Sequence, residues 1–140
     1  MNRVIYVSRG GNTKKIAGAV AKGAGVSAAP IEEFDTLQSS DILFVGASIY
    51  AGSIDGKLRK LLKGLQPSQV KSVAVFGTSA GNKSARQEIK SILEPKGITV
   101  LNEEFHCRGS FLFANRGRPN EEDMRQAEDF AKRVCNDGNE

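Results

Sequence analysis

The chain has 140 residues, of which 39% are apolar and 26% charged. Against a prior of about 150 residues per domain, this length predicts a single domain over residues 1–140 and excludes most multidomain enzymes. The longest apolar stretch, Ile42 to Ala51, is half of the roughly 20 residues that a bilayer span needs, so no membrane span is predicted. The apolar run near the amino terminus is too short for a secretion signal, which favours a cytoplasmic protein.

Positive charge is concentrated at the start of the chain. The net charge is +4, and residues 1–30 contain five basic side chains and no acidic one. Such a segment is suited to an anionic ligand or to a partner protein with an acidic docking face. Nucleic acid is a poor alternative, because the chain has no Trp and its Phe residues lie mostly inside apolar runs.

Short apolar runs alternate with stretches of helical periodicity in the first half of the chain. Residues 4–7 predict a strand, and a glycine-containing segment leads from it into a helix with a buried face between Ile16 and Ala24. A short edge strand is expected near residues 26–31, and residues 42–47 predict the next strand. Leucines from Leu58 to Leu65 mark the following helix. Its basic side chains are expected to point outward: Lys57, Arg59, Lys60 and Lys63.

The same alternation continues in the second half. Residues 73–76 predict a third buried strand, followed by a helix that ends at Pro95 and Gly97. Residues 98–107 predict a long strand. The final helix is capped by Asn120 and has three acidic residues in its first turn. The helix is expected to end at residues 136–138, with two basic residues in its last turn: Lys132 and Arg133.

This order of elements predicts an α/β fold, namely a three-layer, doubly wound domain with a five-stranded parallel sheet. Strands that are apolar throughout are buried on both faces, and right-handed crossovers place helices on both sides of the sheet. In such folds the ligand lies beyond the carboxyl ends of the strands. Three loops are expected there: 8–13, 47–54 and 78–82.

The first loop has the composition of a phosphate-binding turn. It links a strand to the start of a helix, where free N–H groups and the helix dipole favour an anion. Gly10 and Gly11 allow the backbone to curl around phosphate oxygens, and Ser8 and Thr13 carry hydroxyl groups. A tight turn with a helix cap is the alternative. Because no Walker lysine and no dinucleotide G-x-G-x-x-G pattern is present, the favoured ligand is a mononucleotide.

The sequence lacks the residues expected for a receiver domain, a small phosphatase or a zinc site. A receiver domain would need acidic residues after the first and third strands of the sheet, and a small phosphatase would need an Arg six positions after Cys107. Cys107 and Cys135 lack the spacing of a zinc site and are expected to be buried or half-buried thiols. His106 is interpreted as a residue near the end of a strand. No catalytic residue and no metal site are predicted.

Over nearly its whole length the chain resembles the flavodoxin family, in three loop segments and, as in short-chain flavodoxins, in residues 105–109 and 118–123. Residues 8–13 (SRGGNT) resemble the family's phosphate loop for flavin mononucleotide (FMN), and residues 45–52 (VGASIYAG) resemble the loop beside the flavin ring. Residues 76–82 (FGTSAGN) resemble the second ring-binding loop. The resemblance implies FMN as cofactor and the following binding residues: Ser8, Arg9, Gly10, Gly11, Asn12, Thr13, Ser48, Ile49, Tyr50, Ala51, Gly52, Thr78, Ser79, Ala80, Gly81 and Asn82.

The resemblance implies an electron carrier that passes electrons to a partner reductase. In this interpretation Tyr50 stacks on the ring, and Gly52 allows the neighbouring peptide to turn toward it. Two features depart from the family: residues 78–82 contain no aromatic side chain, and the chain is basic where flavodoxins are typically acidic. Two alternatives stay open. One is a flavin-dependent oxidoreductase or reductase accessory, similar to the flavodoxin-fold protoporphyrinogen oxidases, and the other is a flavin-free binding module on the same fold.

Overall fold

A computed structural model describes residues 1–7, 11–35, 38–49, 53–79, 84–108, 117 and 119–137 of the chain. Its strands are β1 (Arg3–Tyr6), β2 (Ala28–Pro30), β3 (Ser40–Ser48), β4 (Val70–Ser79) and β5 (Thr99–Arg108). Its helices are α1 (Asn12–Ala24), α2 (Gly56–Gly64), α3 (Arg86–Leu93) and α4 (Glu121–Asp137), with short 3-10 turns at Ile31–Glu33 and Glu94–Lys96. The strands form one parallel sheet in the order β2-β1-β3-β4-β5, which confirms the predicted fold class.

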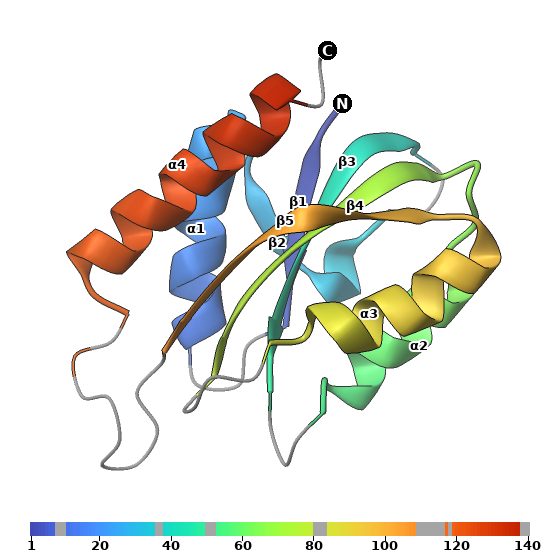
Figure 1. Cartoon of the computed structure of the whole chain (residues 1–140), viewed down its shortest axis with the longest axis horizontal. Helices are drawn as coiled ribbons and strands as arrows, with labels where there is room; N and C mark the ends of the chain where they lie inside the picture. The colour runs from blue at the N-terminus through green and yellow to red at the C-terminus, as the bar shows by residue number, and fades with distance from the viewer. Residues whose placement is uncertain are drawn as a thin grey trace.

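Helices cover both faces of the sheet, as Figure 1 shows: α1 and α4 lie on one face, and α2 and α3 on the other. Each face has its own cluster of buried apolar side chains. Strand β3 is buried without interruption from Ile42 to Ser48, because it lies in the middle of the sheet between the two helical layers. The continuous apolar runs of the sequence therefore correspond to strands buried on both faces.

Helices α1 and α4 are in backbone contact. A Cβ atom added at Gly23 of α1 would lie 2.2 Å from the carbonyl oxygen of Glu128 and 2.9 Å from the Cβ of Ala131, both on α4. A residue with a side chain would force the two helices apart. On the sheet side of the same layer, the ring of Phe130 meets that of Phe44 edge to face, with 6.1 Å between the ring centroids. Small residues and the ring contacts of Phe130 with Phe44 and Phe105 thus hold this layer together.

The start of α4 agrees with the sequence prediction and extends it. The side chain of Asn120 accepts a hydrogen bond from the N–H of Asp123 at 2.9 Å. Asp123 in turn accepts one from the N–H of Asn120 at 2.8 Å, which completes a reciprocal capping box. At the other end α4 stops at Asp137, within the predicted range, but the prediction of two basic residues in its last turn is wrong, because that turn contains none. Lys132 and Arg133 lie one turn earlier.

The predicted stop of α3 is confirmed: the helix ends at Leu93, and a 3-10 turn containing Pro95 ends at its cap Gly97, with a φ of 86°. Two further details differ from the sequence predictions. Strand β2 covers only residues 28–30, half of the six predicted, because a 3-10 turn follows it directly. Arg59 does not point freely outward but contacts α3.

The two edges of the sheet differ in character. On one side β2 is very short and ends with Pro30. On the other side β5 is ten residues long and carries exposed side chains at Glu103 and Glu104. In the part of the chain that the structure describes, no helix has both the length and the apolar character needed to cross a membrane.

Candidate functional site

Three buried hydroxyl groups meet at the carboxyl edge of the sheet. Thr13 comes from the first turn of α1, Ser48 is the last residue of β3, and Thr78 lies one residue before the end of β4. The Thr13 hydroxyl contacts that of Ser48 and lies 3.0 Å from that of Thr78, and the Ser48 and Thr78 hydroxyls are 3.3 Å apart. All three side chains are buried. Residues 35 and 65 positions from Thr13 thus form one polar cluster, because β1, β3 and β4 are neighbours.

The proton count of this cluster indicates how it can respond to a ligand. Three hydroxyl groups carry three protons, and the three contacts among them use one proton each. An anion that accepts a hydrogen bond from one hydroxyl must therefore turn that proton away from its neighbour. The Ser48–Thr78 contact, at 3.3 Å, exceeds the usual range of about 2.5–3.0 Å for O–H···O bonds, so it is the contact that costs least to give up.

The start of α1 adds positive potential next to the cluster. Its N-cap residue, Gly11, has a φ of 85°, a left-handed conformation that glycine adopts without strain and other residues rarely do. The first turn contains no acidic residue but has exposed lysines at Lys14 and Lys15. Helix N-termini attract anions through free N–H groups and the helix dipole. Donor hydroxyls, a helix start and two cations therefore favour an anion here.

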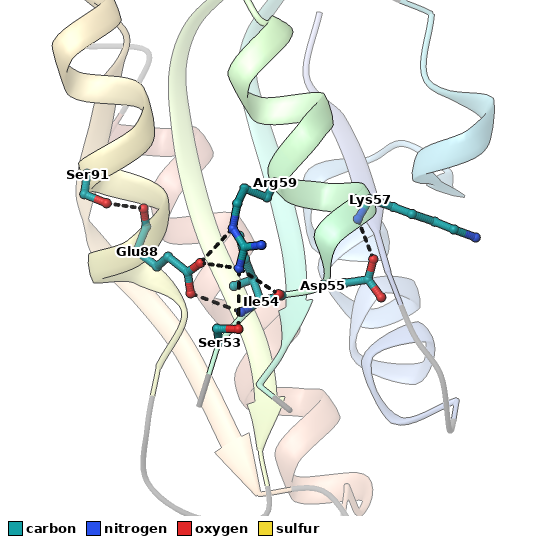
Figure 2. Close-up of polar contacts among 7 residues, drawn as sticks. All are labelled: Ser53, Ile54, Asp55, Lys57, Arg59, Glu88 and Ser91. Carbon is teal, nitrogen blue, oxygen red and sulfur yellow. Dashed lines mark hydrogen bonds and ion pairs between the residues drawn. The ribbon is translucent and has the colours of Figure 1, made fainter. Parts of the chain in front are cut away.

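A second polar cluster fixes the chain shortly after β3, and Figure 2 shows its members. Arg59 on α2 pairs with Glu88 on α3 at 2.9 Å. The guanidinium group of Arg59 also donates to the carbonyl oxygen of Ile54 at 3.3 Å and to the hydroxyl of Ser53 at 3.4 Å. The other carboxylate oxygen of Glu88 accepts a hydrogen bond from the N–H of Ile54 at 3.0 Å. We call Arg59 and Glu88 the clasp.

Local capping explains why α2 begins where it does. The N-cap residue, Asp55, accepts a hydrogen bond from the N–H of Lys57 at 2.7 Å (Figure 2). This cap places Arg59 one turn into the helix, where its side chain reaches back toward Ile54. The side chain of Ile54 is itself buried among apolar residues between the sheet and α2. Residues 53–55 are therefore held by backbone, polar and apolar contacts together.

The sequence-predicted binding residues fall into two groups. The described ones lie at the carboxyl edge of the sheet: Gly11, Asn12, Thr13, Ser48, Ile49, Thr78 and, for its backbone, Ser79. Of these, the structure brings together Thr13, Ser48 and Thr78 through side-chain contacts, and the N–H of Ile49 donates to the carbonyl oxygen of Thr78 at 3.3 Å. The others lie outside the described residues: Ser8, Arg9, Gly10, Tyr50, Ala51, Gly52, Ala80, Gly81 and Asn82.

The cysteines have the environments that the sequence predicts. Cys107 is buried and Cys135 is half-buried, and both are free thiols. Burial raises the pKa of the Cys135 thiol, and a hydrogen bond from the side-chain amide of Asn2, at 3.3 Å, lowers it by a smaller amount. The net effect is a raised pKa for this thiol. His106 is half-buried in β5, two residues before the strand ends.

Comparison with known proteins agrees with the fold. Residues 3–114 match the flavodoxin domain, so the chain belongs to the flavodoxin family. The region beyond residue 114 includes α4, which packs into the same core as α1. Among curated proteins, an uncharacterized protein of Methanocaldococcus jannaschii is 26% identical over 136 residues, covering 88% of this chain and 89% of that protein. Family membership supports a flavin-associated role in electron transfer.

Solved structures share the fold over almost the whole chain. A flavodoxin from the domain Archaea superimposes with a TM-score of 0.82 at 20% identity and covers 99% of both chains. Rubredoxin oxygen:oxidoreductase from the anaerobe Desulfovibrio gigas matches with a TM-score of 0.75 at 16% identity. That match covers 99% of this chain but only 36% of the larger protein. At these identities the likeness concerns the fold.

Proposed function

We propose that this chain binds FMN at the carboxyl edge of its sheet and carries electrons to a partner protein. The observation that carries the proposal is the convergence of the Thr13, Ser48 and Thr78 hydroxyls beside the start of α1. This arrangement fits the phosphate of a mononucleotide, because a phosphate presents several acceptor oxygens to hydroxyl and N–H donors at a helix start. When bound, the flavin supplies the redox chemistry, and the protein supplies binding and electrostatics.

In this proposal the residues of the first loop and α1 bind the phosphate. Thr13 and Ser48 donate hydroxyl protons to it, and Gly11 allows the chain to enter α1 without a side chain in the way. Ser8, Arg9, Gly10 and Asn12 complete the phosphate loop. With those two protons directed at the phosphate, Thr78 donates its own hydroxyl proton to the oxygen of Thr13 or Ser48, so that each buried hydroxyl keeps a partner.

The ring of FMN is assigned to the two following loops. Tyr50 would stack on one face, and Ile49, Ala51 and Gly52 would line the same side. Ser79, Ala80, Gly81 and Asn82 would approach the other face without an aromatic side chain. The partner protein is expected to present an acidic surface, because α1 exposes Lys14 and Lys15 next to this edge.

Titration of the cofactor-free protein with FMN and with riboflavin tests the proposal. Riboflavin has the same ring but no phosphate, so its Kd should be at least about tenfold weaker, the loss expected when hydrogen bonds to a charged group disappear. Quenching of flavin fluorescence and the visible absorption of the dialysed protein measure binding. No retained FMN, or equal affinity for FMN and riboflavin, would contradict the proposal. Catalytic turnover without any added protein partner would favour a flavin enzyme instead of a carrier.

A further inference from the structure

The clasp binds both backbone polar groups of one residue, Ile54. The N–H of Ile54 donates to Glu88 at 3.0 Å, and the carbonyl oxygen of Ile54 accepts from Arg59 at 3.3 Å. The two side chains come from different helices, α2 and α3, and they pair with each other at 2.9 Å and 3.3 Å. Figure 2 shows Arg59 and Glu88 reaching toward the same short segment.

The two hydrogen bonds to Ile54 are not needed to join α2 and α3. An ion pair between α2 and α3 would need only the contact between Arg59 and Glu88. Here Nη2 of Arg59 and the second carboxylate oxygen of Glu88 also contact Ser53 and Ile54. The side chains of Arg59 and Glu88 are 36% and 28% exposed, so they are partly desolvated and their hydrogen bonds are stronger than those of fully exposed pairs.

The other end of the same segment is also fixed. Ser48 belongs to the hydroxyl cluster, and the N–H of Ile49 donates to the carbonyl oxygen of Thr78 on β4. Residues 50–52 therefore connect two anchored points, Ile49 and Ser53. These three residues are the ones that the proposed function assigns to the flavin ring.

From these contacts we infer that Arg59 and Glu88 are positioning residues that hold the ring-binding loop against the flavin. They do not touch the cofactor; they act through Ser53 and Ile54. The inference rests on the proposed function. Without the clasp, binding FMN must also order residues 53–54, so affinity falls. The family resemblance implies that the peptide next to Gly52 turns toward the ring when the flavin is reduced, so the reduced flavin should lose more affinity than the oxidised one.

A charge-balanced double variant, Arg59→Met/Glu88→Met, tests this inference. It removes one positive and one negative charge, keeps similar side-chain volume, and replaces a partly buried pair by apolar groups, a change that folded proteins usually tolerate. The matched control is Lys90→Met/Glu94→Met, which removes the ion pair between Lys90 and Glu94 on the same side of the molecule without touching residues 53–54. Arg59→Lys keeps the charge but loses the forked donor geometry and serves as a milder second variant.

Two measurements are made on each protein. Amide hydrogen exchange at Ile54, without FMN, should be at least about tenfold faster in the double variant than in the parent, because its N–H loses a charged acceptor. The second is the midpoint potential of the bound flavin. It should become more negative by an amount equivalent to about a fivefold change in relative affinity for reduced and oxidised FMN, with Arg59→Lys in between and the control unchanged.

The outcomes separate this inference from the proposed function. If the parent does not bind FMN, the proposed function fails and the assignment of the clasp to the flavin fails with it. If the parent binds FMN but the double variant has the parent's Ile54 exchange rate or flavin potential, the clasp alone is wrong. Equal shifts in the double variant and the Lys90/Glu94 control would also overturn it.

Discussion

Helices α1 and α4 lie side by side on one face of the sheet, but they begin in opposite ways. At the start of α4, Asn120 and Asp123 cap each other's backbone N–H groups, and three acidic residues complement the positive end of the helix. At the start of α1, the N-cap residue Gly11 has no side chain, and the first turn carries Lys14 and Lys15 without any acidic residue.

Side chains of α4 cap its own N-terminus, whereas the start of α1 has no side-chain cap and, under the proposed function, receives an external anion. Two lysines beside the positive end of a helix dipole are unfavourable for α1 by itself. A bound phosphate would remove this repulsion, so ligand binding should stabilise α1 and have no such effect on α4. Substitutions at the start of α1 should therefore change FMN affinity, whereas substitutions at the start of α4 should change only the free energy of unfolding.

The largest effect is expected from reversing the charge at the start of α1. Lys14→Glu/Lys15→Glu should weaken FMN binding on the order of a hundredfold, because four units of charge change next to the phosphate. The same variant without FMN should be more stable by about 0.5–1 kcal/mol, because the acids complement the helix dipole. Titration and urea unfolding measure the two quantities. Lys60→Glu/Lys63→Glu on α2 is the control, and an equal loss of FMN affinity there would show that only total charge matters.

A smaller loss of affinity is expected from Thr13→Val. The substitution keeps the shape of the side chain but removes one hydroxyl donor from the buried cluster, and FMN affinity should fall about tenfold. The exposed Thr99, in β5, provides the matched control Thr99→Val. Isothermal titration of both variants with FMN tests this assignment. A Kd for Thr13→Val equal to that of the parent would show that Thr13 does not bind the phosphate.

Backbone conformation at Gly11 should affect stability by about 1 kcal/mol. A Cβ atom at Gly11 would meet nothing within 4 Å, so the cost of Gly11→Ala comes from the left-handed φ of 85° and not from a clash. Gly11→Asn should cost less, because Asn tolerates this conformation better than Ala. Thermal unfolding of both variants tests the order, and equal losses would mean that φ is not the cause.

The smallest effect is expected at α4. Asp123→Ala removes half of the capping box and should lower the free energy of unfolding by about 0.5–1 kcal/mol. Its FMN affinity should equal that of the parent, because α4 begins with its own cap. A marked change in the FMN affinity of Asp123→Ala would contradict the proposed difference between the starts of α1 and α4.

Much of the fold could be predicted because it depends on local pattern. The continuous apolar runs of β1, β3 and β4 identified buried parallel strands. Thr13, Ser48 and Thr78 meet because these strands are neighbours in the sheet. The cap at Asn120 could also be predicted, because Asn followed by acidic residues is a typical sequence for the start of a helix. Strand β2 is shorter than predicted because a 3-10 turn begins directly after Pro30.

The clasp could not be predicted, because it depends on a long-range pairing. Arg59 stands among lysines on the polar side of α2, and periodicity alone assigns all of them to solvent. Its partner, Glu88, is 29 residues away on another helix. The only local signal is the residue type, since Arg forms forked, partly buried pairs more readily than Lys.

The edges of the sheet bear on how the protein avoids self-association. An exposed edge strand is a template on which another chain can add a strand, which is a common route to aggregates and fibrils. Strand β2 offers only three residues and ends with Pro30, which has no N–H to donate. Strand β5 is long, but Glu103 and Glu104 place negative charge along it. Both edges therefore discourage sheet extension, and another protein is directed toward the helices or toward the loops at the strand ends.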